Sequence, residues 1–410
     1  MRHPLLTVEG AEALAAAMAE SEPDSLAAAS RLRARFSPEV AAAALTQASL
    51  RRRARTKFGA EAQLLWLTPD GLEQASRPEV ATWRAQRLVA AGARRVVDLG
   101  CGIGADARAF LAAGLEVSAV ELDPASAELA QANLPGAEVL VGDATALAES
   151  LLAQADDQTA VFVDPARRGD RGRSWRVEDL SPSWSFVTHL LASRELVCVK
   201  LGPGFPRELI PDGVEACWVS HRGDVVETGL WRLPGAGPSS AAVILPGAHR
   251  IEAGRDALPV RPPGRYLLEP DGAVIRARAL GEISAGAWRL DRDVAYLSCD
   301  EPLSSPFATC FEILETIDAG EKSLRAWVRA HQVGVLEIKK RAIDVDPAAL
   351  RRRLKPSGPN HATIVLARTT EGARGLVVRR TAQDAGRPDA SGAVPDGGIA
   401  QHEDFGTQLV

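Results

Sequence analysis

The segment Val-Val-Asp-Leu-Gly-Cys-Gly-Ile-Gly at residues 96–104 constrains the fold of this chain more than any other stretch. A β-branched run reaches Asp98, and glycines follow at alternate positions, Gly100, Gly102 and Gly104. Glycine lets a backbone turn sharply and leaves room for a ligand to approach the main chain. The first N–H groups of the helix that follows would face that ligand. The segment therefore predicts a strand, a glycine loop and a helix that together bind a nucleotide-type cofactor.

Around this segment, short β-branched runs alternate with Ala-rich helical runs. Such alternation predicts a parallel sheet covered by helices on both faces. The predicted strands are 95–99, 116–121, 138–142, 160–164, 196–201, 215–220 and 225–231. The predicted helices are 80–91, 105–113, 124–133, 146–154 and 184–193.

The chain has 410 residues, which is more than one hydrophobic core usually holds, so several domains are expected. Asp24 or Ser25 marks one helix start near the N-terminus, and Ser37-Pro38 marks another. We expect an N-terminal helical region and leader at 1–78, the alternating domain at 79–232, a β-rich connecting region at 233–330, an α+β module at 331–382 and a disordered tail at 383–410. Within the last two structured parts, strands are expected at 266–268, 273–276, 294–297, 333–341, 362–367 and 375–379, and helices at 322–332 and 347–354.

Acidic residues end the next three strands of the alternating domain. Glu121 follows the second strand, and a carboxylate there can accept hydrogen bonds from both ribose hydroxyls of NAD or of S-adenosylmethionine. Asp143 follows the third strand, where it could accept from an adenine amine, and Asp164-Pro165 follows the fourth. Asp98, before the glycines, suits an ammonium group better than a pyrophosphate. An NAD-dependent dehydrogenase has no use for this series of acids, so the series favours a methyl donor.

With these four motifs the domain resembles the class I S-adenosylmethionine-dependent methyltransferases. The resemblance implies a Rossmann-like sheet of seven strands in the order 3-2-1-4-5-7-6, with the last strand antiparallel. It implies S-adenosyl-L-methionine as the cofactor. It also implies the roles of individual residues: Asp98, Gly100, Gly102 and Gly104 at the methionine part, Glu121 at the ribose, Asp143 at the adenine, and Asp164 and Pro165 as catalytic residues beside the methyl group.

The fourth motif leaves the methyl acceptor open. Asp164-Pro-Ala-Arg167 lacks the second proline and the aromatic residue that are common in methyltransferases for exocyclic base amines. Arg167, Arg168 and Trp175 instead predict a loop that contacts phosphates and stacks a base, the alternative being a solvated arginine loop. The motif is also similar to that of RNA uridine C5 methyltransferases, but Cys198 lies within a strand and is expected to be buried. We therefore expect no covalent intermediate.

Basic residues gather near the C-terminus. Residues 331–381 hold eleven Lys or Arg and four acids, a local charge of +7 in a chain of net charge −5. This predicts a surface that tracks phosphates, with Lys339, Lys340 and Arg341 as substrate contacts, although a solvated basic face is the alternative. The order of strand, Lys-Lys-Arg, Asp-Pro, Arg-rich helix and strand resembles the THUMP-like domain of a bacterial methyltransferase family. By analogy the resemblance implies RNA, either tRNA or rRNA, as the partner.

Three hypotheses follow: an RNA methyltransferase, a methyltransferase for a small molecule or a protein, and a non-catalytic RNA-binding protein with a vestigial cofactor fold. The leader residues Thr68 and Gln74 are candidates for cofactor contacts, and a plain helical lid is the alternative. The five cysteines form no CxxC pair, and no apolar run reaches 18 residues. We therefore expect no metal, no membrane association and a cytoplasmic location.

Overall fold

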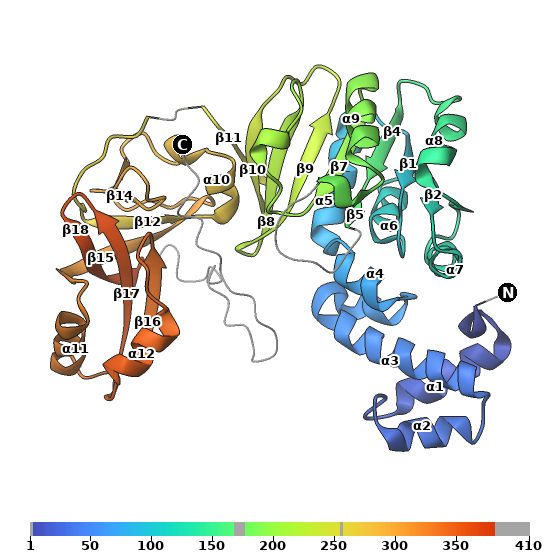
Figure 1. The fold of residues 1–410 in the computed structure, drawn as a ribbon, viewed down its shortest axis with the longest axis horizontal. Coiled ribbons are helices and arrows are strands. Elements are labelled where there is room, and N and C mark those ends of the chain that lie inside the picture. Colours follow the sequence, from blue (N-terminus) through green and yellow to red (C-terminus); the bar gives the residue numbers. More distant parts are fainter. Residues whose placement is uncertain (1–2, 168–176, 255–256, 382–410) are drawn as a thin grey trace. The chain divides into compact units, whose positions relative to one another are not determined.

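The computed structural model describes residues 3–167, 177–254 and 257–381 (Figure 1). The chain opens with the short helix η1 (Pro4–Leu6) and with α1 (Val8–Ala19), α2 (Leu26–Arg33) and α3 (Pro38–Phe58). The expected helix starts are confirmed: of the two candidates Asp24 and Ser25, Ser25 caps α2 with its side-chain oxygen, and Ser37 caps α3 in the same way. The leader continues through η2 (Gly59–Gln63) and α4 (Pro69–Gln74).

The alternating pattern predicted the elements of the next domain to within two residues at each end. Its strands are β1 (Arg95–Leu99), β2 (Glu116–Glu121), β3 (Glu138–Val141), β4 (Thr159–Val163), β7 (Val197–Leu201), β8 (Glu215–His221) and β9 (Asp224–Arg232). Its helices are α5 (Pro78–Ala90), α6 (Ala105–Ala112), α7 (Pro124–Asn133), α8 (Ala144–Leu152) and α9 (Trp184–Ser193). Between β4 and α9 lie β5 (Ala166–Arg167), η3 (Val177–Asp179) and β6 (Leu180–Ser181), and η4 (Arg207–Leu209) follows β7.

The strands of this sheet lie in the order β3-β2-β1-β4-β7-β9-β8, followed by β10 (Ser240–Leu245) and β11 (His249–Glu252). The pairs β1 with β2, β1 with β4, β2 with β3 and β4 with β7 are parallel, and β9 is antiparallel to β7. Because β1, β2, β3 and β4 run the same way, their acid-bearing carboxyl ends meet at one edge. Residues 240–252, expected in a connecting region, extend the sheet instead, since the buried apolar run of β10 pairs with β8.

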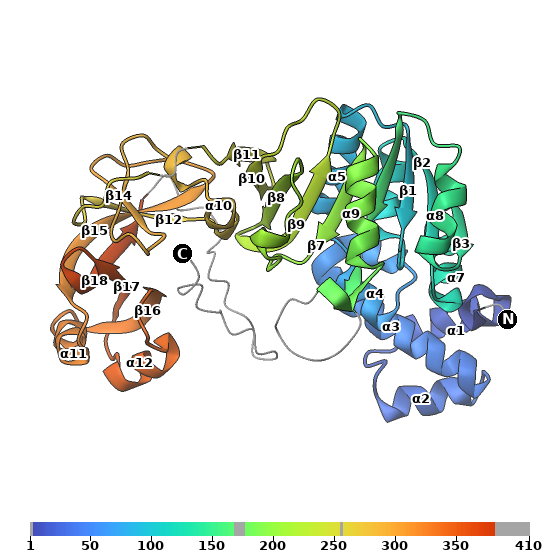
Figure 2. The ribbon, with the colours of Figure 1, turned by 45° about the horizontal axis from the view of Figure 1, so that its top comes forward.

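The described residues divide into two compact units, one within 3–215 and 227–238, and the other within 216–226 and 239–381. The second unit contains a sheet in the order β13 (Trp288–Arg289), β14 (Leu297–Cys299), β12 (Tyr266–Pro270), β15 (Ala308–Asp318), β18 (Gly372–Arg380), β17 (Asn360–Thr369) and β16 (Val333–Arg341). Helices α11 (Glu321–Ala330) and α12 (Pro347–Leu354) pack on β16, β17 and β18 through Leu324, Val328, Leu350 and Leu354 (Figure 2).

Two strand predictions in the second unit are wrong. Residues 273–276 lie in a helix, α10 (Gly272–Arg276), because Asp271 accepts a hydrogen bond from Ala273 N and so caps a helical turn. The strand expected at 294–297 begins only at Leu297, as β14. A further short helix, η5 (Leu280–Glu282), follows α10.

Candidate functional site

The glycine loop after β1 is held close to β2. The N–H groups of Gly100 and Cys101 both donate to the carbonyl of Val120, at 3.0 and 2.9 Å. Gly102 and Gly104 have positive φ angles of 56° and 81°. A methyl group at Gly102 would meet no atom within 4 Å, whereas one at Gly104 would lie 2.8 Å from Leu134. Gly102 therefore leaves open space over the loop, and Gly104 allows close packing beneath it.

Asp98 is a buried acid without a partner. Its side chain is 1% exposed, and neither carboxylate oxygen has a hydrogen-bond partner among the described residues. The pKa of Asp98 is raised to about 8, mainly by burial. The negative charges of Asp164 and Glu121 also raise this pKa, and the positive charges of Lys200 and Arg84 oppose the rise. A buried carboxylate in this state favours a cation. The ammonium group of S-adenosylmethionine fits this requirement.

Glu121 ties the glycine loop to the end of β2. One carboxylate oxygen accepts from Gly102 N at 2.9 Å, and the other accepts from Asp123 N at 3.0 Å. Each oxygen can accept a further hydrogen bond, so both could still bind ribose hydroxyls.

The end of β3 carries Asp143, whose side chain is exposed and caps α8. One of its oxygens accepts from both Thr145 N, at 2.7 Å, and the Thr145 hydroxyl. Sequence reasoning did not name Leu122 and Val141, which are 56% and 55% exposed at neighbouring strand ends. Their apolar side chains suit the flat face of a base. The sequence feature that could have identified them is their position beside the strand-end acids Glu121 and Asp143.

Asp164 is bound by a residue that sequence reasoning missed. The Lys200 ammonium donates to Oδ2 of Asp164 and, at 3.1 Å, to the carbonyl of Gln74. Pro165 is buried next to Asp164. The signal for Lys200 was a charged residue near the end of an otherwise apolar strand, Leu-Val-Cys-Val-Lys. Cys198 in the same strand is fully buried, in agreement with the expectation.

The predicted arginine contacts after Asp164 are described only in part. Arg167 ends β5, which pairs with β6. Arg168 and Trp175 lie outside the described residues.

The leader forms a helix beside the glycine loop. The hydroxyl of Thr68 accepts from Gly71 N at 3.0 Å, so Thr68 caps α4. The Lys57 ammonium donates to the carbonyls of Leu72 and Glu73, at 2.8 and 3.1 Å. Burial, together with the charges of Lys200 and Arg77, lowers the pKa of Lys57 to about 8. These contacts favour the helical lid that was the alternative to direct cofactor contacts.

A second basic residue that sequence reasoning missed is the buried Arg84. Arg84 on α5 is fully buried and pairs with Asp106 on α6 and, at 2.6 Å, with both carboxylate oxygens of Glu227 on β9. The ion pairs fix these three elements relative to one another. Breaking such a buried pair usually destabilises a protein, because it leaves a charge without compensation.

In the second unit, Lys339 is 7% exposed, and its ammonium donates to Glu269 at 2.7 Å. A phosphate contact by Lys339 would break this buried pair, which argues against the expected role. The Arg341 guanidinium lies 5.8 Å from the centre of the Tyr296 ring, and Lys340 is half-buried.

Several other basic side chains of this module are engaged with acids. Arg353 pairs with Glu321, Arg368 with Asp291 and Asp293, Arg374 with Glu371, and Arg379 with Glu312. Within residues 308–380, five exposed cations have no ion pair among the described residues, and they lie on α11 or at α12: Lys322, Arg329, Arg351, Arg352 and Lys355. In the described part of the module, the exposed unpaired cations therefore lie on the two helices and not on β16.

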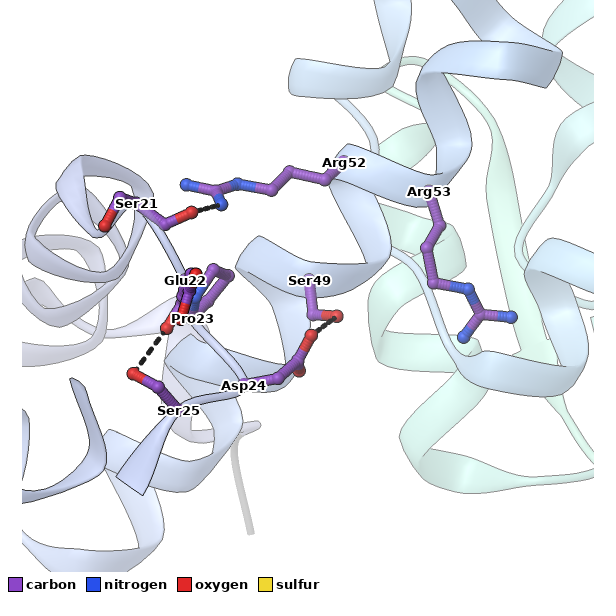
Figure 3. Close-up of a pocket in the computed structure, with 8 residues that line it drawn as sticks. All are labelled: Ser21, Glu22, Pro23, Asp24, Ser25, Ser49, Arg52 and Arg53. Carbon is purple, nitrogen blue, oxygen red and sulfur yellow. Dashed lines mark hydrogen bonds between the residues drawn. The ribbon is translucent and has the colours of Figure 1, made fainter. Parts of the chain in front are cut away.

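A polar hollow in the N-terminal helical region lies apart from the glycine loop in sequence and is lined by Ser21, Glu22, Pro23, Asp24, Ser25, Ser49, Arg52 and Arg53 (Figure 3). Arg52 donates to the carbonyls of Ser21 and Glu20, and Ser49 donates to Asp24 at 2.9 Å. These contacts hold the loop between α1 and α2 against α3. We assign the hollow a structural role.

The described residues contain no group of three or more His, Cys, Asp or Glu placed to hold a metal ion. Of the helices described, none combines the length and the apolar character needed to cross a membrane.

Family models match three parts of the chain. Residues 97–157 match a methyltransferase domain, residues 308–380 match a THUMP domain-like family, and residues 2–54 match a domain of unknown function. The THUMP-like match begins at β15, earlier than the module expected at 331–382. The reason is that β15 pairs with β18 along most of its length.

Similar whole proteins are also known. An uncharacterized S-adenosylmethionine-dependent methyltransferase, found in two strains of Mycobacterium tuberculosis, is 34% identical over 337 residues, which cover 79% of this chain and 91% of the relative. The crystal structure of a candidate methyltransferase from Porphyromonas gingivalis W83 has the same fold, with a TM-score of 0.76, 22% identity, and coverage of 91% of this chain and 98% of that one. The chain belongs to the S-adenosylmethionine-dependent methyltransferases that carry a C-terminal THUMP-like domain.

Proposed function

We propose that this protein methylates RNA, either tRNA or rRNA, with S-adenosylmethionine as the donor. The observation that carries the proposal is the set of five unpaired cations on α11 and α12, which belong to the THUMP-like part of the chain. Exposed cations without acidic partners are available to neutralise phosphates. Methylation of these RNAs would take place in the cytoplasm.

In this proposal the cofactor is held along the edge formed by β1, β2 and β3. Asp98 accepts from the ammonium group, and Gly100, Gly102 and Gly104 let the methionine part approach the main chain. Glu121 binds the ribose hydroxyls, because each of its oxygens retains a free lone pair. Asp143 accepts from the adenine amine, with Leu122 and Val141 beside the ring.

Asp164 and Pro165 act beside the reacting group. Bound S-adenosylmethionine supplies a methyl group that is already electrophilic, so the protein contributes mainly orientation. Lys200 engages Oδ2 of Asp164, while Oδ1 has no hydrogen-bond partner among the described residues. Oδ1 would accept a hydrogen bond from an N–H or O–H of the acceptor and so orient the acceptor's lone pair. Arg167 and Arg168 would contact the phosphates next to the acceptor.

The RNA contacts of the THUMP-like part are reassigned. We propose that Lys322, Arg329, Arg351, Arg352 and Lys355 contact phosphates in place of Lys339, which is paired with Glu269. Lys340 and Arg341 were also predicted from the sequence as substrate contacts. Both are only partly exposed, so they offer less surface to a phosphate than the five exposed cations.

The proposal is tested by incubating the purified protein with S-adenosylmethionine labelled in the methyl group. Total tRNA and rRNA from a strain that lacks the gene serve as acceptors, and mass spectrometry of the nucleosides locates the label. We expect label in one nucleoside with the wild-type protein and none with Asp164→Asn. The absence of transfer to either RNA would overturn the proposal, and label in a protein or a small molecule would assign a different acceptor.

A further inference from the structure

Lys200 joins two parts of the methyltransferase site that are far apart in the sequence. Its ammonium bonds Asp164 at the end of β4 and the carbonyl of Gln74 at the end of α4. The Lys200 side chain is 12% exposed and that of Asp164 is 31% exposed. Because the pair is partly shielded from water, it is screened less than an ion pair on the surface.

The C-terminal end of α4 is held by two lysines. The last carbonyls of a helix have no partner within the helix, and cations near them are favourable. Lys57 from α3 binds the carbonyls of Leu72 and Glu73, and Lys200 from β7 binds that of Gln74. Of these two ammonium groups, only that of Lys200 also contacts Asp164 in the described structure.

The body of α4 rests on the glycine loop. Leu72 and Ile103 belong to the same buried cluster, and a methyl group at Gly71 would overlap the side chain of Ile103. Ile103 stands between Gly102 and Gly104, the two glycines of the loop with the positive φ angles described above. A displacement of α4 would therefore reach the loop that faces the cofactor.

We propose that Lys200 is a positioning residue that couples α4 to Asp164, so that the lid over the glycine loop and the acid beside the methyl group are ordered together. The inference rests on the proposed function only in taking Asp164 as that acid. The alternative is that Lys200 only caps the end of α4, in which case changes at Asp164 would not affect α4.

The test is a pair of double-mutant cycles in the full-length chain. One cycle combines Lys200→Met with Asp164→Asn, and the other combines Lys57→Met with Asp164→Asn. Lys57→Met is the matched control, because Lys57 holds the same helix end without contacting Asp164. Calorimetry gives the affinity for S-adenosylmethionine and S-adenosylhomocysteine, and hydrogen exchange reports the amides of residues 69–75.

Both lysine variants should weaken cofactor binding and speed amide exchange in α4. In the Lys200 cycle, the double variant should lose about two- to tenfold less affinity than the product of the single losses, because the two residues act as one unit. In the Lys57 cycle, the single losses should multiply. The proposal is overturned if K200M leaves affinity and exchange at the wild-type level, or if its loss multiplies with that of D164N.

If K200M does not fold, D164N alone still decides the question. Removing the carboxylate charge should loosen Lys200 and speed exchange at residues 72–74, and unchanged exchange there would overturn the coupling. None of these measurements needs a methyl acceptor. A failure to methylate RNA would therefore count against the proposed function and leave this inference standing.

Discussion

Asp98 has a protonation state that should depend on what binds beside it. Its pKa of about 8 means that most of the free protein carries a proton on this acid at pH 7. An ammonium group binds the ionised form, so cofactor binding should release a proton at pH 7. Affinity should accordingly rise between pH 6 and pH 8, until the amino group of the cofactor, whose class titrates at about 7.7–8.0, loses its own charge.

Calorimetry in two buffers of different ionisation enthalpy measures this proton release. Asp98→Asn should abolish both the release and the rise with pH, and it should weaken binding by about tenfold or more, the worth of a charged hydrogen bond. A wild-type affinity that is flat from pH 6 to 8 would contradict the assignment. The free protein offers a second check. A carboxyl whose pKa is raised on folding costs stability as pH rises toward 8, so D98N should gain stability relative to wild type at pH 8 more than at pH 5.

At the scale of the element, two substitutions in the glycine loop should distinguish an effect on cofactor binding from an effect on folding. Gly102→Ala places a methyl group in open space at a positive φ, so it should cost about 1–2 kcal/mol of stability from backbone strain. Gly104→Ala meets the same strain and also the side chain of Leu134. Its loss of stability should therefore be larger.

Denaturant titration measures the two stabilities, and calorimetry measures cofactor binding. We expect G102A to remain folded and to lose affinity for S-adenosylmethionine, because the added methyl group occupies the approach to the main chain. Wild-type affinity in G102A would show that the cofactor does not pass over this position.

Elements with a strong periodic pattern were predictable from the sequence, and short ones were not. Strands β1 and β2 have the predicted bounds, because burial of their central residues on both faces favours the mostly apolar runs that the sequence shows. Residues 273–276 contain adjacent Val and Ile and were assigned to a strand, yet the cap supplied by Asp271 makes them helical. In so short a segment a single capping hydrogen bond outweighs β propensity.

The strand-end acids were predictable for the same reason, since the sheet direction places Asp98, Glu121 and Asp164 at one edge. Their partners were not. Lys200 reaches Asp164 across 36 residues of sequence, and Lys339 reaches Glu269 across 70 residues. Charge counts along the sequence cannot separate paired cations from unpaired ones. The structure makes that separation, and on this basis we propose phosphate contacts on α11 and α12 in place of Lys339 on β16.

At the scale of the whole molecule, the chain has a net charge of −5, yet the described part of its THUMP-like region presents exposed cations without ion pairs on α11 and at α12. Each phosphate contact contributes about −0.7 to −0.9 to the slope of log affinity against log salt concentration. The triple variant R351Q/R352Q/K355Q should therefore bind total tRNA with a slope shallower by about two units. R368Q/R374Q/R379Q removes the same charge from side chains already paired with acids, so its slope should stay close to wild type. Equal changes in the two variants, measured by filter binding across a salt series, would mean that RNA responds to net charge and that α12 is no specific contact surface.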